Sequence, residues 1–205
     1  MKVVEFWFEF ASTYTYPAAM RIEELAHARG IELRWQPFLL GPIFRDQGWP
    51  DSPFNIYPVK GRYMWRDLQR ICQELGLELT KPSQFPRNGL LAARVCCACA
   101  RAAWIPSFVR NVYIANFAED RDIADPQVVA GCLAELVENP AAILGAADGD
   151  AAKACLRQNT EQAKALGIFG SPSFVVDGEL FWGNDRLEAA FEWAESDIRR
   201  NQGRK

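Results

Sequence analysis

A serine stands where the first strand of the chain should end and the first helix should begin. Segment 3–10, VVEFWFEF, alternates and is rich in strand-forming residues, and Ser12 lies two residues beyond it. Free N–H groups at a helix start favour an anion by roughly 0.3–2 kcal/mol and lower the pKa of a thiol held there. Because the chain has no cysteine at this place, a reacting thiol would have to come from a ligand. Serine is also a common helix N-cap, and on local sequence alone the cap is the commoner role.

Two later segments could bind a small peptide. Segment 170–174, GSPSF, puts Pro172 at the start of a short strand, which suits a cis bond after Ser171 and leaves an edge that could pair with an extended backbone. Segment 182–186, WGNDR, opens the last expected helix, where N–H groups and polar side chains could hold a carboxylate and an ammonium. An ordinary turn and an ordinary helix cap are the alternative interpretations.

Positive charge gathers in segment 55–70, NIYPVKGRYMWRDLQR. Lys60, Arg62 and Arg66 all lie within it. They could receive the anionic groups of a substrate. A solvated basic helix face is the usual explanation for such a run and stays open as the alternative.

The cysteines give no strong metal or redox signal. Cys96 and Cys99 form a C-x-x-C pair, but the flanking run 90–103 looks like the middle of a helix, with no strand before it to present the pair. We interpret the six cysteines as small buried hydrophobic residues in a reducing compartment. We expect no metal site, because the single histidine, His27, is predicted to lie on the surface.

The elements that position these residues follow from hydrophobic periodicity and from turn residues. The chain begins strand, helix, strand, then reads as a long loop over 39–60 and as helices almost throughout 61–166, and it ends in a hairpin and a helix. We expect Asp185 to cap that last helix, with a glutamate at its third position as in a capping box, and Asp125 to cap the helix that begins with Pro126. The expected strands are 3–10, 31–38, 173–177 and 179–182, and the expected helices are 14–29, closed by Gly30, then 61–76, 88–103, 106–118, 125–137, 140–145, 149–166 and 186–198.

This order predicts an α/β protein with a thioredoxin-like domain that carries a large all-helical insertion. The two ends together give the β-α-β and β-β-α halves of a thioredoxin domain. We therefore predict one domain from residues 1–60 and 167–205, and an inserted helical domain from residues 61–166.

Composition excludes several other classes. The net charge of −3 lacks the basic footprint of a nucleic-acid-binding protein. No apolar stretch approaches the ~18 residues of a membrane span, and Glu5 and Glu9 interrupt any signal-peptide core. The expected location is the cytoplasm.

Five segments together resemble the 2-hydroxychromene-2-carboxylate isomerase family, which is related to the kappa-class glutathione transferases. The resemblance covers roughly residues 3–197 and is most specific in the last segment. The matching segments are FEFASTYTY at 8–16, NIYPVKGRYM at 55–64, FPRN at 85–88, GIFGSPSF at 167–174 and FWGNDRL at 181–187.

The resemblance implies glutathione as cofactor and gives roles to individual residues. Ser12 would donate its hydroxyl to the glutathione sulfur, and Ser171, before cis Pro172, would pair its backbone with the cysteinyl part. The family commonly has an aliphatic residue at the position of Ser171. The other implied contacts are Trp182, Gly183, Asn184 and Asp185 for the γ-glutamyl end, Asn55 and Lys60 for the glycine carboxylate or an acidic substrate, and Asn88 on the substrate side.

The implied activity is isomerisation of an aromatic acid like 2-hydroxychromene-2-carboxylate, through reversible addition of the glutathione thiolate. Relatives of this family are commonly dimers, so a homodimer is also implied. Two alternatives remain. One is a glutathione transferase or peroxidase that consumes the thiol, and the other is a thioredoxin-like binding module without activity. A thiol-disulfide oxidoreductase is disfavoured, because no cysteine lies at the junction near Ser12.

Overall fold

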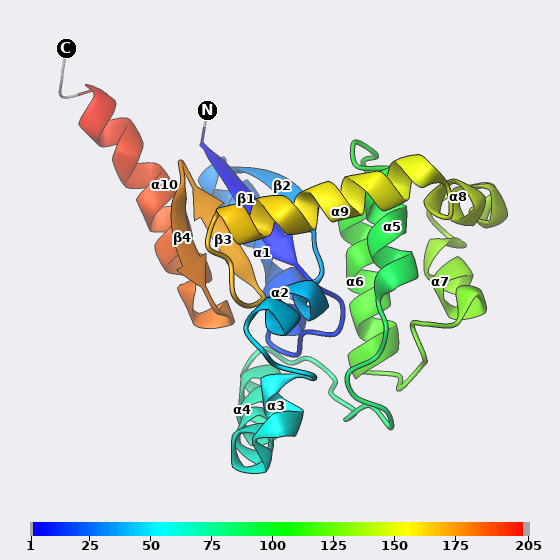
Figure 1. Ribbon diagram of the computed structural model, residues 1–205. Coiled ribbons are helices and arrows are strands. Elements are labelled where there is room, and N and C mark those ends of the chain that lie inside the picture. The colour runs from blue at the N-terminus through cyan, green and yellow to red at the C-terminus, as the bar shows by residue number, and fades with distance from the viewer. Residues whose placement is uncertain (1, 203–205) are drawn as a thin grey trace.

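The two ends of the chain form one four-stranded sheet, as the sequence predicts (Figure 1). The computed structural model describes residues 2–202, so the last three residues of the predicted segment 167–205 lie outside the described residues. The strand order is β2-β1-β3-β4, with β1 and β2 parallel and the other two pairs antiparallel. The strands are β1 Val3–Phe8, β2 Glu32–Pro37, β3 Ser173–Val176 and β4 Glu179–Trp182.

The two central strands, β1 and β3, are largely buried on both faces, and alternate residues of β1 point to the two sides of the sheet. Phe6 and Phe8 point into the larger core, which α1 (Thr15–Arg29) and α10 (Leu187–Gln202) help to cover. Trp7 points into a smaller core with residues of α2 (Leu40–Asp46) and α9 (Asp150–Ala165). The sheet is therefore a middle layer between helices.

Between residues 61 and 166 the regular elements of the described chain are all helices and no strand is present, in agreement with the expected elements. The boundaries between the predicted domains stay a prediction. The helices that lie between α2 and α9 are α3 Pro53–Ile56, α4 Pro58–Glu74, α5 Leu90–Ala98, α6 Ile105–Phe117, α7 Pro126–Leu133 and α8 Pro140–Ala147. Asp125 caps α7 through its carboxylate and the N–H of Gln127, as predicted.

The prediction of a long loop over 39–60 is wrong. This segment contains α2, α3 and the start of α4. Pro53 and Pro58 occupy the first turns of α3 and α4, where a proline costs no hydrogen bond, so they begin helices instead of breaking them.

The start of the last helix also differs from its prediction. A short 3₁₀ turn, η1 (Asn184–Arg186), precedes α10, and no side-chain cap is formed at it. Glu188 does not complete a capping box, because its carboxylate pairs with the guanidinium of Arg21 on α1. A cation in reach gives a carboxylate a stronger, charge-assisted partner than a backbone N–H does.

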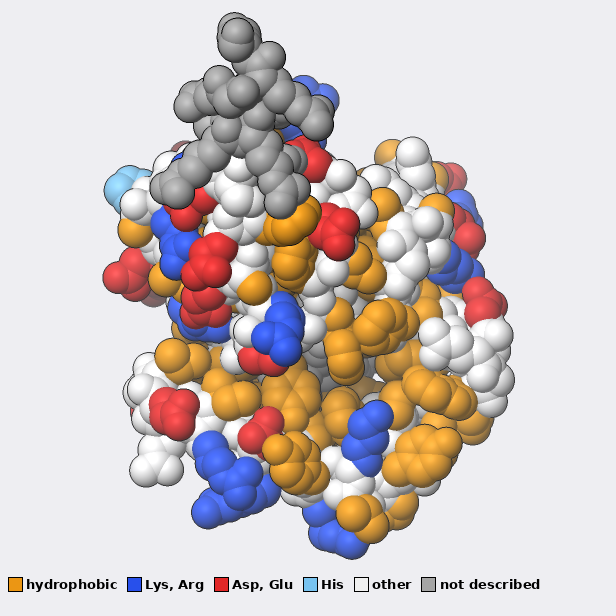
Figure 2. All heavy atoms as spheres, turned by 90° about the vertical axis from the view of Figure 1, so that its left-hand side faces the viewer, with side chains coloured by type: hydrophobic (Ala, Val, Ile, Leu, Met, Phe, Trp, Pro, Cys, Tyr) orange, Lys and Arg blue, Asp and Glu red, His pale blue; other side chains and the backbone are white. Residues whose placement is uncertain are grey.

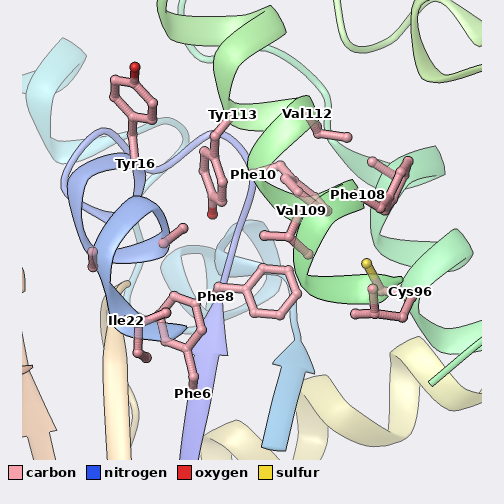
Figure 3. Close-up of a cluster of buried hydrophobic side chains, with 14 of the residues drawn as sticks. Phe6, Phe8, Phe10, Tyr16, Ile22, Cys96, Phe108, Val109, Val112 and Tyr113 are labelled. Atoms are coloured by element: carbon pink, nitrogen blue, oxygen red, sulfur yellow. The ribbon is translucent and has the colours of Figure 1, made fainter. Parts of the chain in front are cut away.

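An aromatic cluster fixes the segment that carries Ser12 (Figure 3). Phe8 and Phe10 pack edge to face, and Phe10 contacts the ring of Tyr113 on α6. The Tyr113 hydroxyl donates to the carbonyl of Glu9 at 2.9 Å, and the side-chain amide of Asn116 donates to the carbonyl of Phe10 at 3.1 Å. Helix α6 thus holds the chain between β1 and α1 through both packing and hydrogen bonds.

Candidate functional site

Ser12 lies in the turn between β1 and α1, and its hydroxyl points across to the other half of the fold. Its Oγ donates to the carbonyl oxygen of Ser171 at 2.7 Å, over a sequence separation of 159 residues. The residue at the N-cap position of α1 is Tyr14, and no side chain caps this helix. The helix-cap role that local sequence favoured for Ser12 is therefore wrong.

The segment around Pro172 is joined to both sides of the site. The Ser171–Pro172 bond is cis, as predicted, and both residues are buried. The Ser171 Oγ accepts from the N–H of Glu9 at 3.0 Å and shares a 2.7 Å hydrogen bond with the hydroxyl of Thr15. The Pro172 carbonyl accepts from the N–H of Gly183 at 2.9 Å. These bonds bring Ser12, Ser171, Pro172 and Gly183 into one place.

Within the described residues, the N–H of Ser171 has no hydrogen-bond partner. A backbone N–H left free beside a cis proline can donate to an extended peptide that lies along this edge. The Ser171 carbonyl beside it is bound to the Ser12 hydroxyl, which can rotate to another acceptor.

The four residues 182–185 face in different directions. Trp182 is exposed, and its indole lies over Gly170 and beside the ring of Phe169, with ring centroids 4.7 Å apart. A Cβ at position 170 would lie 2.3 Å from the indole nitrogen, so only glycine fits there. Asn184 is buried, and its carbonyl and side-chain oxygens both accept from Arg21. Asp185 is exposed, with a 3.6 Å ion pair to its neighbour Arg186.

Tyr14 connects this site to helix α4. Its hydroxyl donates to the carboxylate of Asp67 at 3.0 Å, and its ring contacts that of Phe54. Burial and the hydrogen bond to Asp67 raise the pKa of the Tyr14 hydroxyl well above its usual value, so it stays protonated and donates. Lys60 is exposed, and its ammonium lies over the ring of the same Phe54, 5.8 Å from the ring centroid.

Two of the predicted residues have local structural roles. The side-chain amide of Asn55 donates to Asp51 and to the carbonyl of Phe85, and the side-chain oxygen of Asn88 accepts from the N–H of Leu90. Among the described residues, no hydrogen bond joins Asn55, Lys60 or Asn88 to Ser12 or Ser171. Sequence reasoning assigned Asn55 and Asn88 from the resemblance alone, and Lys60 from the resemblance and from the run of positive charge in 55–70.

The face that bears α3 and α4 is apolar and basic. Figure 2 shows hydrophobic side chains gathered over its lower half, next to Lys and Arg side chains. Large exposed hydrophobic residues here are Tyr57, which lies between the two helices, and Val59 and Tyr63 of α4. Such a surface can hold an aromatic ring that carries a negative group.

Glu9 is a residue of the site that sequence reasoning passed over. It is half-buried at the end of the first strand segment, and its carboxylate accepts from the N–H of Ala11 at 3.1 Å. Burial raises the pKa of this carboxyl to about 8. The sequence shows only an acidic residue between two phenylalanines, and the burial of its carboxyl depends on tertiary packing.

Neither a metal cluster nor a membrane span is found in residues 2–202. No group of three or more His, Cys, Asp or Glu side chains in that part of the chain could hold a metal ion. None of the described helices is long and apolar enough to cross a membrane. A cavity of about 640 Å³ lies along β2 and the 100–106 segment, and none of the predicted site residues lines it.

The arrangement suits a bound thiol more than a thiol of the protein. All six cysteines are free, and none lies at Ser12 or Pro172. What the site offers is a hydroxyl donor, the N-terminus of a 15-residue helix, a free backbone N–H and an exposed carboxylate. This set can stabilise a thiolate and hold a short peptide at two points.

Comparisons with known proteins agree with this fold. The 2-hydroxychromene-2-carboxylate isomerase of Sphingobium xenophagum is 27% identical over 188 residues, which are 91% of this chain and 95% of that protein. Glutathione S-transferase kappa 1 of Homo sapiens is 26% identical over 204 residues, 91% of this chain and 88% of that protein. A solved structure of a 2-hydroxychromene-2-carboxylate isomerase superposes with a TM-score of 0.84 at 25% identity, covering 99% of both chains.

These similarities confirm the resemblance seen in the sequence and the thioredoxin-like fold with many helices. The model of the DSBA-like thioredoxin domain matches residues 3–192, nearly the whole chain. The protein belongs to the DSBA-like thioredoxin domain family.

Proposed function

We propose that this protein is a glutathione-dependent isomerase that acts on an aromatic acid like 2-hydroxychromene-2-carboxylate. The observation that carries the proposal is the hydrogen bond between the Ser12 hydroxyl and the carbonyl before cis Pro172. It puts a hydroxyl donor, and no cysteine, at the N-terminus of α1. The similarity to isomerases over about nine-tenths of the chain supports the same reaction class.

Glutathione would be held at its cysteinyl part and at both of its ends. The free N–H of Ser171 can donate to the cysteinyl carbonyl, and exposed Asp185 can accept from the γ-glutamyl ammonium. Trp182, Gly183 and Asn184 would complete that end, with Asn184 held in place by Arg21. At the other end, Lys60 and Asn55 would meet the glycine carboxylate.

Ser12 would stabilise the ionised form of the bound sulfur. Its hydroxyl can rotate from the Ser171 carbonyl to an anion, since a charge-assisted hydrogen bond is roughly twice as strong as a neutral one. When bound, glutathione supplies a thiolate that adds reversibly to an electron-poor double bond of the substrate and leaves unchanged.

The substrate would lie between this thiol and the surface of α3 and α4. Tyr57 and Tyr63 offer exposed rings for an arene, and Lys60 offers a cation for its carboxylate. Asn88 would contact the substrate from the start of α5. We also propose a cytoplasmic homodimer that acts on small molecules and not on nucleic acid, because the resemblance and the charge of −3 support this assignment.

A kappa-like transferase or peroxidase is the second candidate, and the similarity to glutathione S-transferase kappa 1 favours it. The two functions differ in the fate of the thiol. An isomerase leaves the free thiol concentration constant while substrate is converted, whereas a transferase or peroxidase consumes one or two thiols for each turnover.

Ser12→Ala tests the proposal. Loss of one hydrogen bond to a charged group costs roughly 1.5–3 kcal/mol, so turnover and the thiolate fraction of bound glutathione should fall about ten- to a hundred-fold. Thiolate absorbance and isomer conversion are measured with glutathione present. Ser196→Ala is the matched control, because Ser196 also donates to a backbone carbonyl but lies on α10. If Ser12→Ala retains the parent's thiolate absorbance and rate, the proposed mechanism is wrong.

A further inference from the structure

Two cysteines that are far apart in the sequence lie together in the helical part of the chain. The thiols of Cys97, near the end of α5, and Cys155, in α9, are joined by a side-chain hydrogen bond. Both residues are half-buried and both thiols are free. The pair that the sequence suggested, Cys96 and Cys99, lies within and just after α5, and its first member is buried in the main core.

The packing of α5 against α9 explains this contact. Helix α9 crosses α5 in Figure 1, and the two helices are in contact. Cys96 and Leu156 turn into the core, so the residues next to them, Cys97 and Cys155, meet at the edge of the same interface. In each helix the cysteine of the pair is therefore the direct sequence neighbour of a core residue.

We propose that Cys97 and Cys155 are an oxidation site that closes to a disulfide when the protein meets a peroxide. In the first step the Cys155 thiolate attacks one oxygen of hydrogen peroxide, giving a sulfenic acid and hydroxide, which takes up a proton to become water. In the second step Cys97 attacks the sulfenic sulfur, and its proton leaves with the departing hydroxyl as a second water. Two thiols and one peroxide give one disulfide and two waters.

The surroundings set the order of the two steps. Burial and the neighbouring Cys155 raise the pKa of the Cys97 thiol well above its usual value. Cys97 therefore stays protonated and acts second. A cavity of about 480 Å³ opens beside Cys97, is lined also by Cys99, Arg101 and Trp104, and is large enough for a peroxide. The raised pKa of Cys97 slows the second step, the closure of the disulfide.

The bond would tie α5 to α9 and close the chain between residues 97 and 155. Closing a loop of this length lowers the entropy of the unfolded chain more than that of the folded chain. The oxidised protein should melt several degrees higher than the reduced protein, in the range of roughly 3–8 °C. This site lies outside the glutathione site proposed above, and its chemistry does not depend on that proposal.

The test is treatment of the intact protein with hydrogen peroxide, followed by mass spectrometry. The expected result is a mass loss of about 2 Da, loss of two of the six free thiols, a cross-linked peptide that contains Cys97 and Cys155, and reversal by dithiothreitol. Cys97→Ser and Cys155→Ser should each abolish the mass loss, and Cys99→Ser, the matched control, should keep it. The melting temperature of each reduced variant shows that it is folded. A Cys96–Cys99 cross-link, or oxidation of single thiols with no cross-link, would overturn the proposal.

Discussion

Replacing Glu9 by glutamine should stabilise the protein at alkaline pH and leave it unchanged at acid pH. Burial raises the pKa of the Glu9 carboxyl from 4.5 in an unfolded chain to about 8 in the folded protein. Below pH 4.5 both states are protonated, so the group does not affect stability. Between pH 4.5 and 8 only the unfolded chain ionises, and the parent loses stability as the pH rises. Above pH 8 both states are ionised and the loss is constant.

The size of the effect follows from this pH interval. Each pH unit is worth about 1.4 kcal/mol, so an interval of about 3.5 units gives a ceiling of roughly 5 kcal/mol. Because Glu9 is only half-buried, we expect about 2–3 kcal/mol, with the difference reached by pH 9. Glutamine has nearly the same shape, and its carbonyl can still accept from the N–H of Ala11.

Urea unfolding of parent and variant from pH 4 to pH 9 measures this difference directly. Glu179→Gln removes an exposed carboxylate from β4 and controls for the change in net charge. Glu9→Gln should gain stability relative to this control only above pH 4.5. If the stability curves of Glu9→Gln and the parent stay parallel over the whole range, the carboxyl is not held protonated and the reasoning fails.

Three further substitutions separate binding from stability. Asp185→Ala should weaken glutathione binding about tenfold, near 1.4 kcal/mol in calorimetry. It should not lower the melting temperature, since Asp185 caps no helix. Equal affinity of variant and parent would rule out the ammonium contact. Ser171→Ala removes the partner of the Glu9 N–H but keeps the backbone groups, so it should cost roughly 1–3 kcal/mol of stability in urea and change glutathione affinity less than twofold. Arg87→Met should lower the free energy of unfolding by about 3–5 kcal/mol, because the buried guanidinium binds Asp120 and several carbonyls. The control Arg121→Ala should lower it little, and equal losses in urea unfolding would contradict this prediction.

The regular elements could be predicted because each depends on neighbours in the sequence. The alternation in 3–10, the Asp177–Gly178 turn and the left-handed Gly30 all act locally, and the structure confirms the elements they indicate. The segment 39–60 was misjudged because proline begins a helix as readily as it ends one, and only the following residues decide which.

The hydrogen bonds of the site could not be predicted in this way. Ser12 could be recognised as special from its position and from the resemblance, but the acceptor of its hydroxyl lies 159 residues away. Likewise Cys97 and Cys155 meet only because α9 crosses α5, and the C-x-x-C spacing of Cys96 and Cys99 gives no hint of this contact. Burial of the Glu9 carboxyl is also a tertiary effect, which residue type alone does not determine.

The pairing of β1 with β3 has a consequence for the order in which the protein is made. On a ribosome, β1, α1 and β2 emerge first, but the antiparallel partner of β1 begins at Ser173. Until then one edge of β1 stays open, and an open apolar edge is prone to pair with other chains. The site around Ser12 therefore does not exist in a nascent chain that has reached only α9. A ligand of that site cannot assist folding before the last sixth of the sequence has left the exit tunnel.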